Sequence, residues 1–259
     1  MIYKIAAYSE IGIVKKTNQD SVLMKVAQTN HGRVCLCVVC DGMGGLANGE
    51  LASATVIREF DKWFRKDLPA MLEMPVFPVE ELRLQWGNLV LEQNKKLDDY
   101  ASSPGQRMGT TVVAFLIVGE NYYIMNIGDS RAYMITDAIY QLTKDQTYVQ
   151  FEMDAGRMTW EEAQVHPQRN VLLQCIGASE QINPDYFIGQ ANPDTTFLLC
   201  SDGFRHLISP DEIYEKLKPE ILDNEDTMLQ NAISLIELNK TRKEVDNISV
   251  AVIRTCREG

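Results

Sequence analysis

Aspartates recur in this sequence where apolar runs begin or end, and their carboxylates suggest a shared chemical role. Asp41 ends the run RVCLCVVC, Asp129 follows YYIMNIG, and Asp202 follows TTFLLCS. Asp20 and Asp246 stand on the other side of such runs, before SVLM and NISVAVI. A charged side chain is costly to bury without a partner. We therefore interpret these strand-end carboxylates as parts of one site that holds a hard cation.

The ligand types indicate Mg²⁺ or Mn²⁺ rather than zinc. Carboxylates, backbone carbonyls and water are the ligands that these two ions prefer. Zinc sites use histidine or cysteine, and His31, His166 and His206 show no recognisable ligand spacing. Gly42 directly follows Asp41, and because it has no Cβ atom its carbonyl can face an ion. A single Asp-Gly pair usually marks only a turn, so the recurrence of the pattern carries the argument.

Two other phosphate chemistries fit the sequence less well. A cysteine-nucleophile phosphatase needs a thiolate and an arginine in a Cys-x5-Arg loop. Cys200 with Arg205 is one residue short of that spacing, and a buried strand-end cysteine is the simpler interpretation. A P-loop nucleotide site is excluded, because the sequence contains no G-x-x-x-x-G-K-[ST] motif.

Strands and amphipathic helices must position the aspartates. Apolar runs rich in β-branched and aromatic residues predict strands at 33–40, 110–118, 122–128, 131–135, 195–200 and 247–253. Apolar residues at helical spacing predict helices near 57–64, 80–100 and 229–236. Ser209, Pro210 and Glu212 form a helix-start signal. The short loop 119–121 predicts a hairpin, which favours an α+β domain of antiparallel sheets covered by helices.

The whole chain has the composition of a globular protein. Its 259 residues are 45% hydrophobic and contain no internal repeat or linker, so we expect one domain over 1–259 with a polar flap at about 145–170. A net charge of −11 argues against nucleic acid as a partner. No basic segment leads into a long apolar one, and no stretch has the length of a membrane span. With only six cysteines, we expect a soluble cytoplasmic protein with reduced thiols.

A set of short motifs resembles one known family. The motifs are NQD at 18–20, DGMGG at 41–45, MGTT at 108–111, GDSR at 128–131, CSDGF at 200–204 and DNISV at 246–250. Their order and spacing resemble the metal-dependent protein phosphatases of type 2C, in particular the bacterial members. The resemblance covers nearly the whole chain. It implies a four-layer αββα sandwich in which two stacked antiparallel sheets are flanked by helix pairs.

The resemblance also implies roles for the strand-end residues. Asp41 would bridge two Mn²⁺ or Mg²⁺ ions, while Asp202 and Asp246 would hold one ion and the Gly42 carbonyl the other. Asp129 would help to bind a third, weaker metal. The implied catalytic set is Asp20, Asp41, Asp202 and Asp246, with Asp20 orienting bound waters beside the metals.

Three positions depart from the family pattern. Gln19 stands where the family often has glutamate, which removes one negative charge near the second metal. Lys15 replaces the phosphate-binding arginine, and a lysine cannot grip phosphate with two parallel hydrogen bonds. Lys16 is its neighbour, and alternation allows only one of the two lysines to face the site. Met43 stands where eukaryotic members place a histidine that is proposed as a general acid.

The implied activity is hydrolysis of phosphoserine and phosphothreonine in proteins by a water activated between two divalent metals. Phosphorylated proteins would be the partners, together with a Ser/Thr protein kinase that shares its targets, and we expect a monomer. A non-catalytic phosphoprotein-binding module on the same fold is the alternative that Lys15 and Gln19 leave open. Retention of Asp41, Asp129 and the other strand-end aspartates favours the enzyme.

Overall fold

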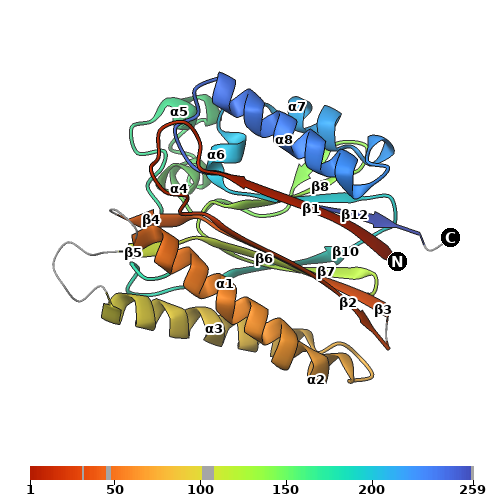
Figure 1. Ribbon diagram of the computed structural model, residues 1–259. Helices are drawn as coiled ribbons and strands as arrows, with labels where there is room; N and C mark the ends of the chain where they lie inside the picture. Colours follow the sequence, from red (N-terminus) through yellow and green to blue (C-terminus); the bar gives the residue numbers. More distant parts are fainter. Residues whose placement is uncertain (31, 45–47, 101–107, 258–259) are drawn as a thin grey trace.

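The computed structural model describes residues 1–30, 32–44, 48–100 and 108–257, and it consists of two stacked antiparallel sheets between layers of helices (Figure 1). The first sheet has the order β1-β12-β11-β8-β9. Its strands are β1 (Ile2–Glu10), β12 (Ile248–Cys256), β11 (Thr196–Cys200), β8 (Arg131–Ile135) and β9 (Ile139–Gln141). Each neighbouring pair in this sheet is antiparallel.

The second sheet has the order β10-β7-β6-β3-β2 and is also antiparallel throughout. Its strands are β10 (Asp185–Gln190), β7 (Asn121–Ile127), β6 (Val112–Val118), β3 (Gly32–Cys40) and β2 (Ser21–Thr29). A small extra pair, β4 (Gly42–Gly44) and β5 (Met108–Thr110), lies at one end of this sheet.

Helices form the two outer layers (Figure 1). The second sheet is covered by α1 (Asn48–Lys66), α2 (Leu68–Leu72) and α3 (Val79–Tyr100), and the first by α7 (Pro210–Leu217) and α8 (Glu225–Thr241). The shorter helices are α4 (Tyr148–Asp154), α5 (Trp160–Val165), α6 (Asp202–Arg205) and the 3₁₀ turn η1 (Pro219–Ile221). The predicted four-layer α+β sandwich is therefore confirmed.

The apolar pattern of each strand explains this layering. In β3, Cys35 and Cys37 face the other sheet, whereas Cys40 faces the helices, as period-two alternation requires. Between the sheets, the rings of Phe115 and Phe197 lie 4.8 Å apart. Because both faces of β3 are buried, its sequence is an almost continuous apolar run.

Several elements differ from the sequence-based prediction. The run 110–118 is divided into β5 and β6, because Thr111 interrupts the pairing. The hairpin after β6 turns at Gly119 and Glu120, and Gly119 takes a φ of +61° that suits glycine. The strands β1, β2, β4, β9 and β10 were not predicted, because they are partly exposed or short and their apolar pattern is weak. The capping box of Ser209 and Glu212 is confirmed at the start of α7.

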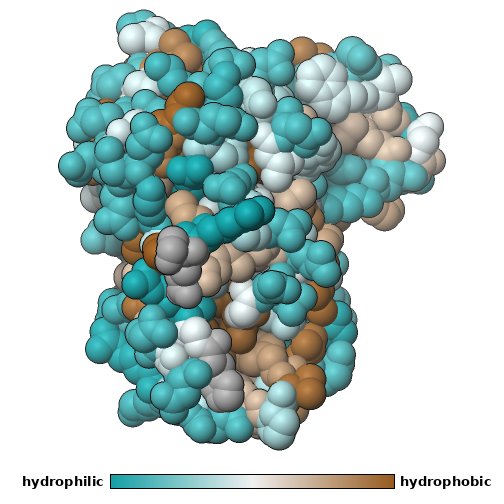
Figure 2. Space-filling model, turned by 90° about the vertical axis from the view of Figure 1, so that its right-hand side faces the viewer, coloured by the Kyte–Doolittle hydropathy of each residue, from teal (hydrophilic) through white to brown (hydrophobic). Residues whose placement is uncertain are grey.

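The aspartates lie at one end of the sandwich, and both chain termini lie at the other (Figure 1). Hydrophilic residues cover most of the end that carries the termini (Figure 2). None of the helices in the described part of the chain combines the length and the apolar character that crossing a bilayer requires.

Candidate metal centre

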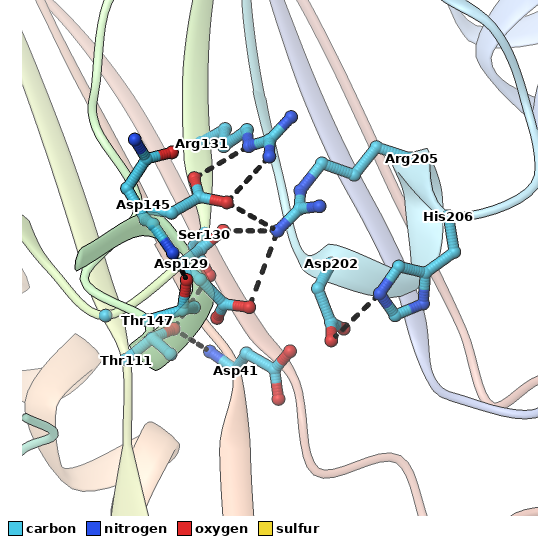
Figure 3. Close-up of polar contacts among 12 residues, drawn as sticks. Asp41, Thr111, Asp129, Ser130, Arg131, Asp145, Thr147, Asp202, Arg205 and His206 are labelled. Carbon is cyan, nitrogen blue, oxygen red and sulfur yellow. Dashed lines mark hydrogen bonds and ion pairs between the residues drawn. The ribbon is translucent and has the colours of Figure 1, made fainter. Parts of the chain in front are cut away.

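The structure gathers the strand-end aspartates from both sheets. Asp41 comes directly after β3 and Asp20 directly before β2, both in the second sheet. Asp202 begins α6 just after β11, and Asp246 precedes β12, both in the first sheet. The carboxylate of Asp41 interacts electrostatically with those of all the others, including Asp129 from the β7–β8 connection. Figure 3 shows Asp41, Asp129 and Asp202 around one space.

Burial and mutual repulsion make the carboxyl groups of Asp20, Asp41 and Asp129 hard to ionise without added positive charge. Burial raises the pKa of Asp41 well above its ordinary value, and Asp20 and Asp202 raise it further. Burial likewise raises the pKa of Asp20 to about 7, against hydrogen bonds from Ser249 and Ser201 that lower it. The pKa of Asp129 is also raised to about 7, mainly by burial. A bound cation would offset this cost.

The backbone of Asp41 is fixed by the MGTT and GDSR motifs. The Asp41 N–H donates to the hydroxyl of Thr111 at 3.0 Å, and the Thr111 N–H donates to the Asp41 carbonyl at 2.9 Å. The Thr110 hydroxyl also donates to that carbonyl, at 3.0 Å. The hydroxyls of Thr111 and Ser130 lie 2.7 Å apart. These motifs therefore hold the carboxylate at a defined place.

Gly42 lies where backbone segments crowd together. A Cβ atom there would approach the carbonyl oxygen of Gly49 to 2.2 Å and that of Gln19 to 2.4 Å. Its N–H donates to the Gln19 carbonyl at 3.2 Å, and the Gln19 side-chain amide donates to the carbonyl of Gly44 at 3.2 Å. Glycine is required here by the close approach of these chains, and the Gln19 amide supplies a donor that a glutamate would lack.

Cationic side chains of the protein itself contact several of the acids. Lys15 Nζ lies 2.7 Å from Asp246 Oδ1, although the Lys15 side chain is still 38% exposed. Lys16 is exposed as well. Partial burial lowers the pKa of Lys15, but the Asp246 hydrogen bond and the charges of Asp41 and Asp202 outweigh it and raise the pKa.

Sequence reasoning missed a cluster of arginine, histidine and acid beside these aspartates. Arg205 was considered only as a partner of Cys200, yet it contacts Asp129, and His206 Nε2 lies 3.5 Å from Asp202 Oδ2. A local signal existed only for His206, because it follows Asp202 by four residues. The other partner of His206 is Glu244, 3.5 Å from Nδ1.

The donor set fits a hard cation. Asp20 Oδ1 and Asp202 Oδ1 are buried without a hydrogen-bond partner among the described residues, which a cation or its waters would provide. Within that same part of the chain, no three acidic, histidine or cysteine side chains converge as a finished ligand set. The reason is visible in the contacts, since Asp246 turns toward Lys15 and Asp202 toward His206. Asp41 is central to the group in the sense that its carboxylate interacts electrostatically with those of the other four aspartates.

A cleft of about 800 Å³ opens beside the aspartates. Asp129 and Asp246 belong to its wall, which continues to Trp160 and Val165 of α5 and to Lys243. Helix α5 lies in the 145–170 segment, and a capping box of Thr159 and Glu162 starts it. The cleft therefore joins the acidic site to a partly apolar surface large enough for a polypeptide segment.

The sequence pattern that defines the family described as Protein phosphatase 2C matches residues 13–237. The chain belongs to the protein phosphatase 2C family. The resemblance stated from the motifs is thus confirmed, and the two antiparallel sheets with flanking helices are the fold of solved members of this family.

Bacterial phosphatase 2C proteins are similar along nearly the whole chain. The serine/threonine protein phosphatase PstP of Mycobacterium tuberculosis is 33% identical over 258 residues, which is 97% of this chain but 45% of that protein. This chain therefore spans less than half the length of that relative. A putative protein phosphatase 2C-type from Streptococcus pyogenes is 30% identical over 253 residues, covering 96% of both chains.

Solved phosphatase 2C structures superpose closely. The serine/threonine phosphatase PstP/Ppp of Mycobacterium tuberculosis has a TM-score of 0.82 at 32% identity, covering 99% of this chain and 100% of that one. The catalytic domain of PstP in complex with two manganese ions has a TM-score of 0.78 at 30% identity, covering 98% of this chain and 99% of that one.

Proposed function

We propose that this chain is a protein serine/threonine phosphatase that hydrolyses phosphoserine and phosphothreonine with the help of two Mn²⁺ or Mg²⁺ ions. The observation that carries the proposal is the meeting of four buried or partly buried carboxylates from strand ends of two sheets: Asp20, Asp41, Asp202 and Asp246. Burial raises the pKa values of Asp20 and Asp41 there. Family membership supports the same conclusion, as do relatives of this family named as serine/threonine phosphatases. Residues 1–259 would form one domain, with 145–170 as its flap.

Asp41, Asp202 and Asp246, together with the Gly42 carbonyl, are the groups that would hold the metals. When bound, divalent cations lower the pKa of a water molecule and polarise the phosphoryl group. Side chains of this protein would then position the reacting groups. The Ser201 hydroxyl donates to Asp20 Oδ2 at 2.8 Å, which leaves Oδ1 to orient the attacking water.

Lys15 is the group that would neutralise the phosphate. Its ammonium lies at the edge of the aspartate cluster, where it reaches Asp246. As a single point charge it contributes attraction without the two-pronged geometry of arginine. The cleft beside Asp129 and Asp246 would receive the polypeptide that carries the phosphate. The partners would accordingly be phosphorylated proteins and a Ser/Thr kinase that modifies the same targets, with this chain acting as a monomer.

A metal-dependence assay tests this proposal directly. We expect the protein to hydrolyse p-nitrophenyl phosphate and a phosphothreonine peptide with Mn²⁺, and EDTA to abolish both activities. Asp41→Asn should lose activity by about 100-fold or more, because it removes the central carboxylate from a charge-stabilising site. Iodoacetamide should have little effect, because the pKa of the buried Cys200 thiol is raised to about 12.

The outcome also separates the alternatives. Activity that survives EDTA but is lost with iodoacetamide would favour a cysteine nucleophile. Binding of the phosphopeptide without turnover at any metal concentration would instead favour a non-catalytic module.

A further inference from the structure

We propose that the guanidinium of Arg205 is the permanent cation partner of Asp129, so that this chain takes no divalent ion at Asp129. This inference rests on the proposed function in one respect, which is that Asp41, Asp202 and Asp246 bind metal ions. The inference concerns the neighbouring position, where the family resemblance implies a third, weaker metal.

The contacts of Arg205 define this position (Figure 3). Its Nη2 atom donates to the Asp129 carbonyl at 3.0 Å and lies 3.4 Å from Asp129 Oδ2. The same nitrogen lies 3.3 Å from Asp145 Oδ2. One guanidinium nitrogen thus stands among the oxygen atoms of two carboxylates and a carbonyl, which is the kind of ligand set that a hard cation would otherwise use.

A second arginine holds this arrangement in place. Arg131 grips Asp145 with two parallel hydrogen bonds, from Nε at 2.7 Å and from Nη2 at 2.6 Å. Because Asp145 is held in this bidentate pair, its Oδ2 is presented to Arg205. Asp129 precedes β8, Asp145 precedes α4, and Arg205 ends α6, so three separate segments fix the guanidinium.

Burial leaves little water around this pairing. The side chains of Arg205 and Asp129 are 12% and 10% exposed, and that of Asp145 is 9% exposed. Arginine does not lose its proton in proteins, so Arg205 and Arg131 keep two fixed positive charges beside Asp129 and Asp145. A divalent ion at Asp129 would lie close to a fixed positive charge with little water between them, and this repulsion opposes binding.

In the part of the chain that the structure describes, the other aspartates of the site have no arginine partner, and Asp202 contacts His206 instead. Within the described residues, no ion pair joins Asp20 or Asp41 to a basic side chain, and Lys15 reaches Asp246 from a more exposed position. The negative charge left for metals is therefore concentrated around Asp41. Arg205 acts as a positioning residue for Asp129 and the start of α4, and the lack of metal at Asp129 follows from its charge.

Manganese stoichiometry tests this inference without an activity measurement. Isothermal titration calorimetry and electron paramagnetic resonance of free Mn²⁺ would be applied to the wild type, Asp129→Asn and Arg205→Met. We expect two ions in the wild type and two in Asp129→Asn, because Asp129 holds none. In Arg205→Met, which keeps the side-chain length but removes the charge, a third and weaker site should appear. It should disappear again in the Arg205→Met/Asp129→Asn double variant.

Two further variants separate charge from structure. Arg205→Lys keeps a positive charge and should still bind two ions, and Arg131→Met leaves Arg205 on Asp129 and should also bind two. A third ion in the wild type that is lost in Asp129→Asn would overturn the inference, as would the absence of a third ion in folded Arg205→Met. If Arg205→Met does not fold, the wild type and Asp129→Asn decide the question. Failure of every variant to bind manganese would instead contradict the proposed function.

Discussion

At the scale of single residues, the site depends on aspartates that resist ionisation in the folded chain. The pKa of Asp20 is raised from 3.8 to about 7, chiefly by burial, and Asp129 is shifted to a similar value. Between pH 3.8 and about pH 7, the folded protein holds protons on these carboxyl groups that the unfolded chain has released. The metal-free protein should therefore lose stability as pH rises through this window.

This loss of stability with rising pH can be measured. In EDTA, we expect the thermal midpoint to fall by several degrees between pH 5 and pH 8. His206, whose pKa is lowered by burial but raised overall by Glu244 and Asp202, changes stability in the same direction. Glu212 has the opposite effect on stability, but only at lower pH, because Arg242 lowers its pKa to about 2. Differential scanning calorimetry of the wild type and Asp20→Asn measures the effect, and an equal slope in both would contradict the role of Asp20.

At the scale of elements, the connection between β5 and β6 determines where Asp41 lies. Thr111 sits in this connection, with one hydrogen bond to the Asp41 N–H and a contact with Ser130. The side chain is 1% exposed, so no water replaces a lost hydroxyl. A nearly isosteric change at Thr111 thus tests how firmly the motif holds the carboxylate.

Thr111→Val should lower the free energy of unfolding by about 1–3 kcal/mol, because a buried N–H loses its acceptor. Metal affinity should fall as well, because Asp41 is no longer held. Urea denaturation and manganese titration measure the two effects. Thr55→Val is the matched control, because Thr55 bonds only within α1 at an exposed position, and it should change stability by less than about 0.5 kcal/mol. Equal losses in both variants would contradict the proposed role of Thr111.

The element scale also shows where sequence patterns are informative. The run at 33–40 and the helix-start signal at Ser209 predicted β3 and α7, because buried alternation and capping are local properties. Strand β10 was missed because it forms the edge of a sheet and its side chains are partly exposed. The arginine cluster was missed for a different reason. The partners of Arg205 lie 60 and 76 residues away along the chain, and no local pattern reports such a contact.

At the scale of the whole molecule, the order of strands places the candidate site. Asp41 and Asp20 extend from neighbouring strands of one sheet, and Asp202 and Asp246 from neighbouring strands of the other. The sequence could predict that these residues share a function, since each stands at a strand end. It could not predict that their carboxylates would already pair with Lys15, His206 and Arg205, because such contacts depend on the assembled sheets.

Metal binding should stabilise the folded molecule. Manganese bound only by the native chain raises the thermal midpoint as its concentration increases. We expect a concentration-dependent rise at pH 7.5 that EDTA reverses and that Asp41→Asn removes. Differential scanning fluorimetry measures it. Asp61→Asn in α1 is the control that should retain the full rise, because Asp61 pairs with Lys25 and Arg65 and not with the aspartates of the site. A midpoint unchanged by manganese in the wild type would contradict a native metal site.

The position of Asp41 and Asp20 on one layer, opposite Asp202 and Asp246 on the other, has a mechanical consequence. Metal ions bound there, as proposed, would be held from both sides and would connect the two layers of the sandwich. Sliding of the two layers past each other would separate these ligands, so the resistance of the protein to shear and the tightness with which it holds its ions should rise and fall together.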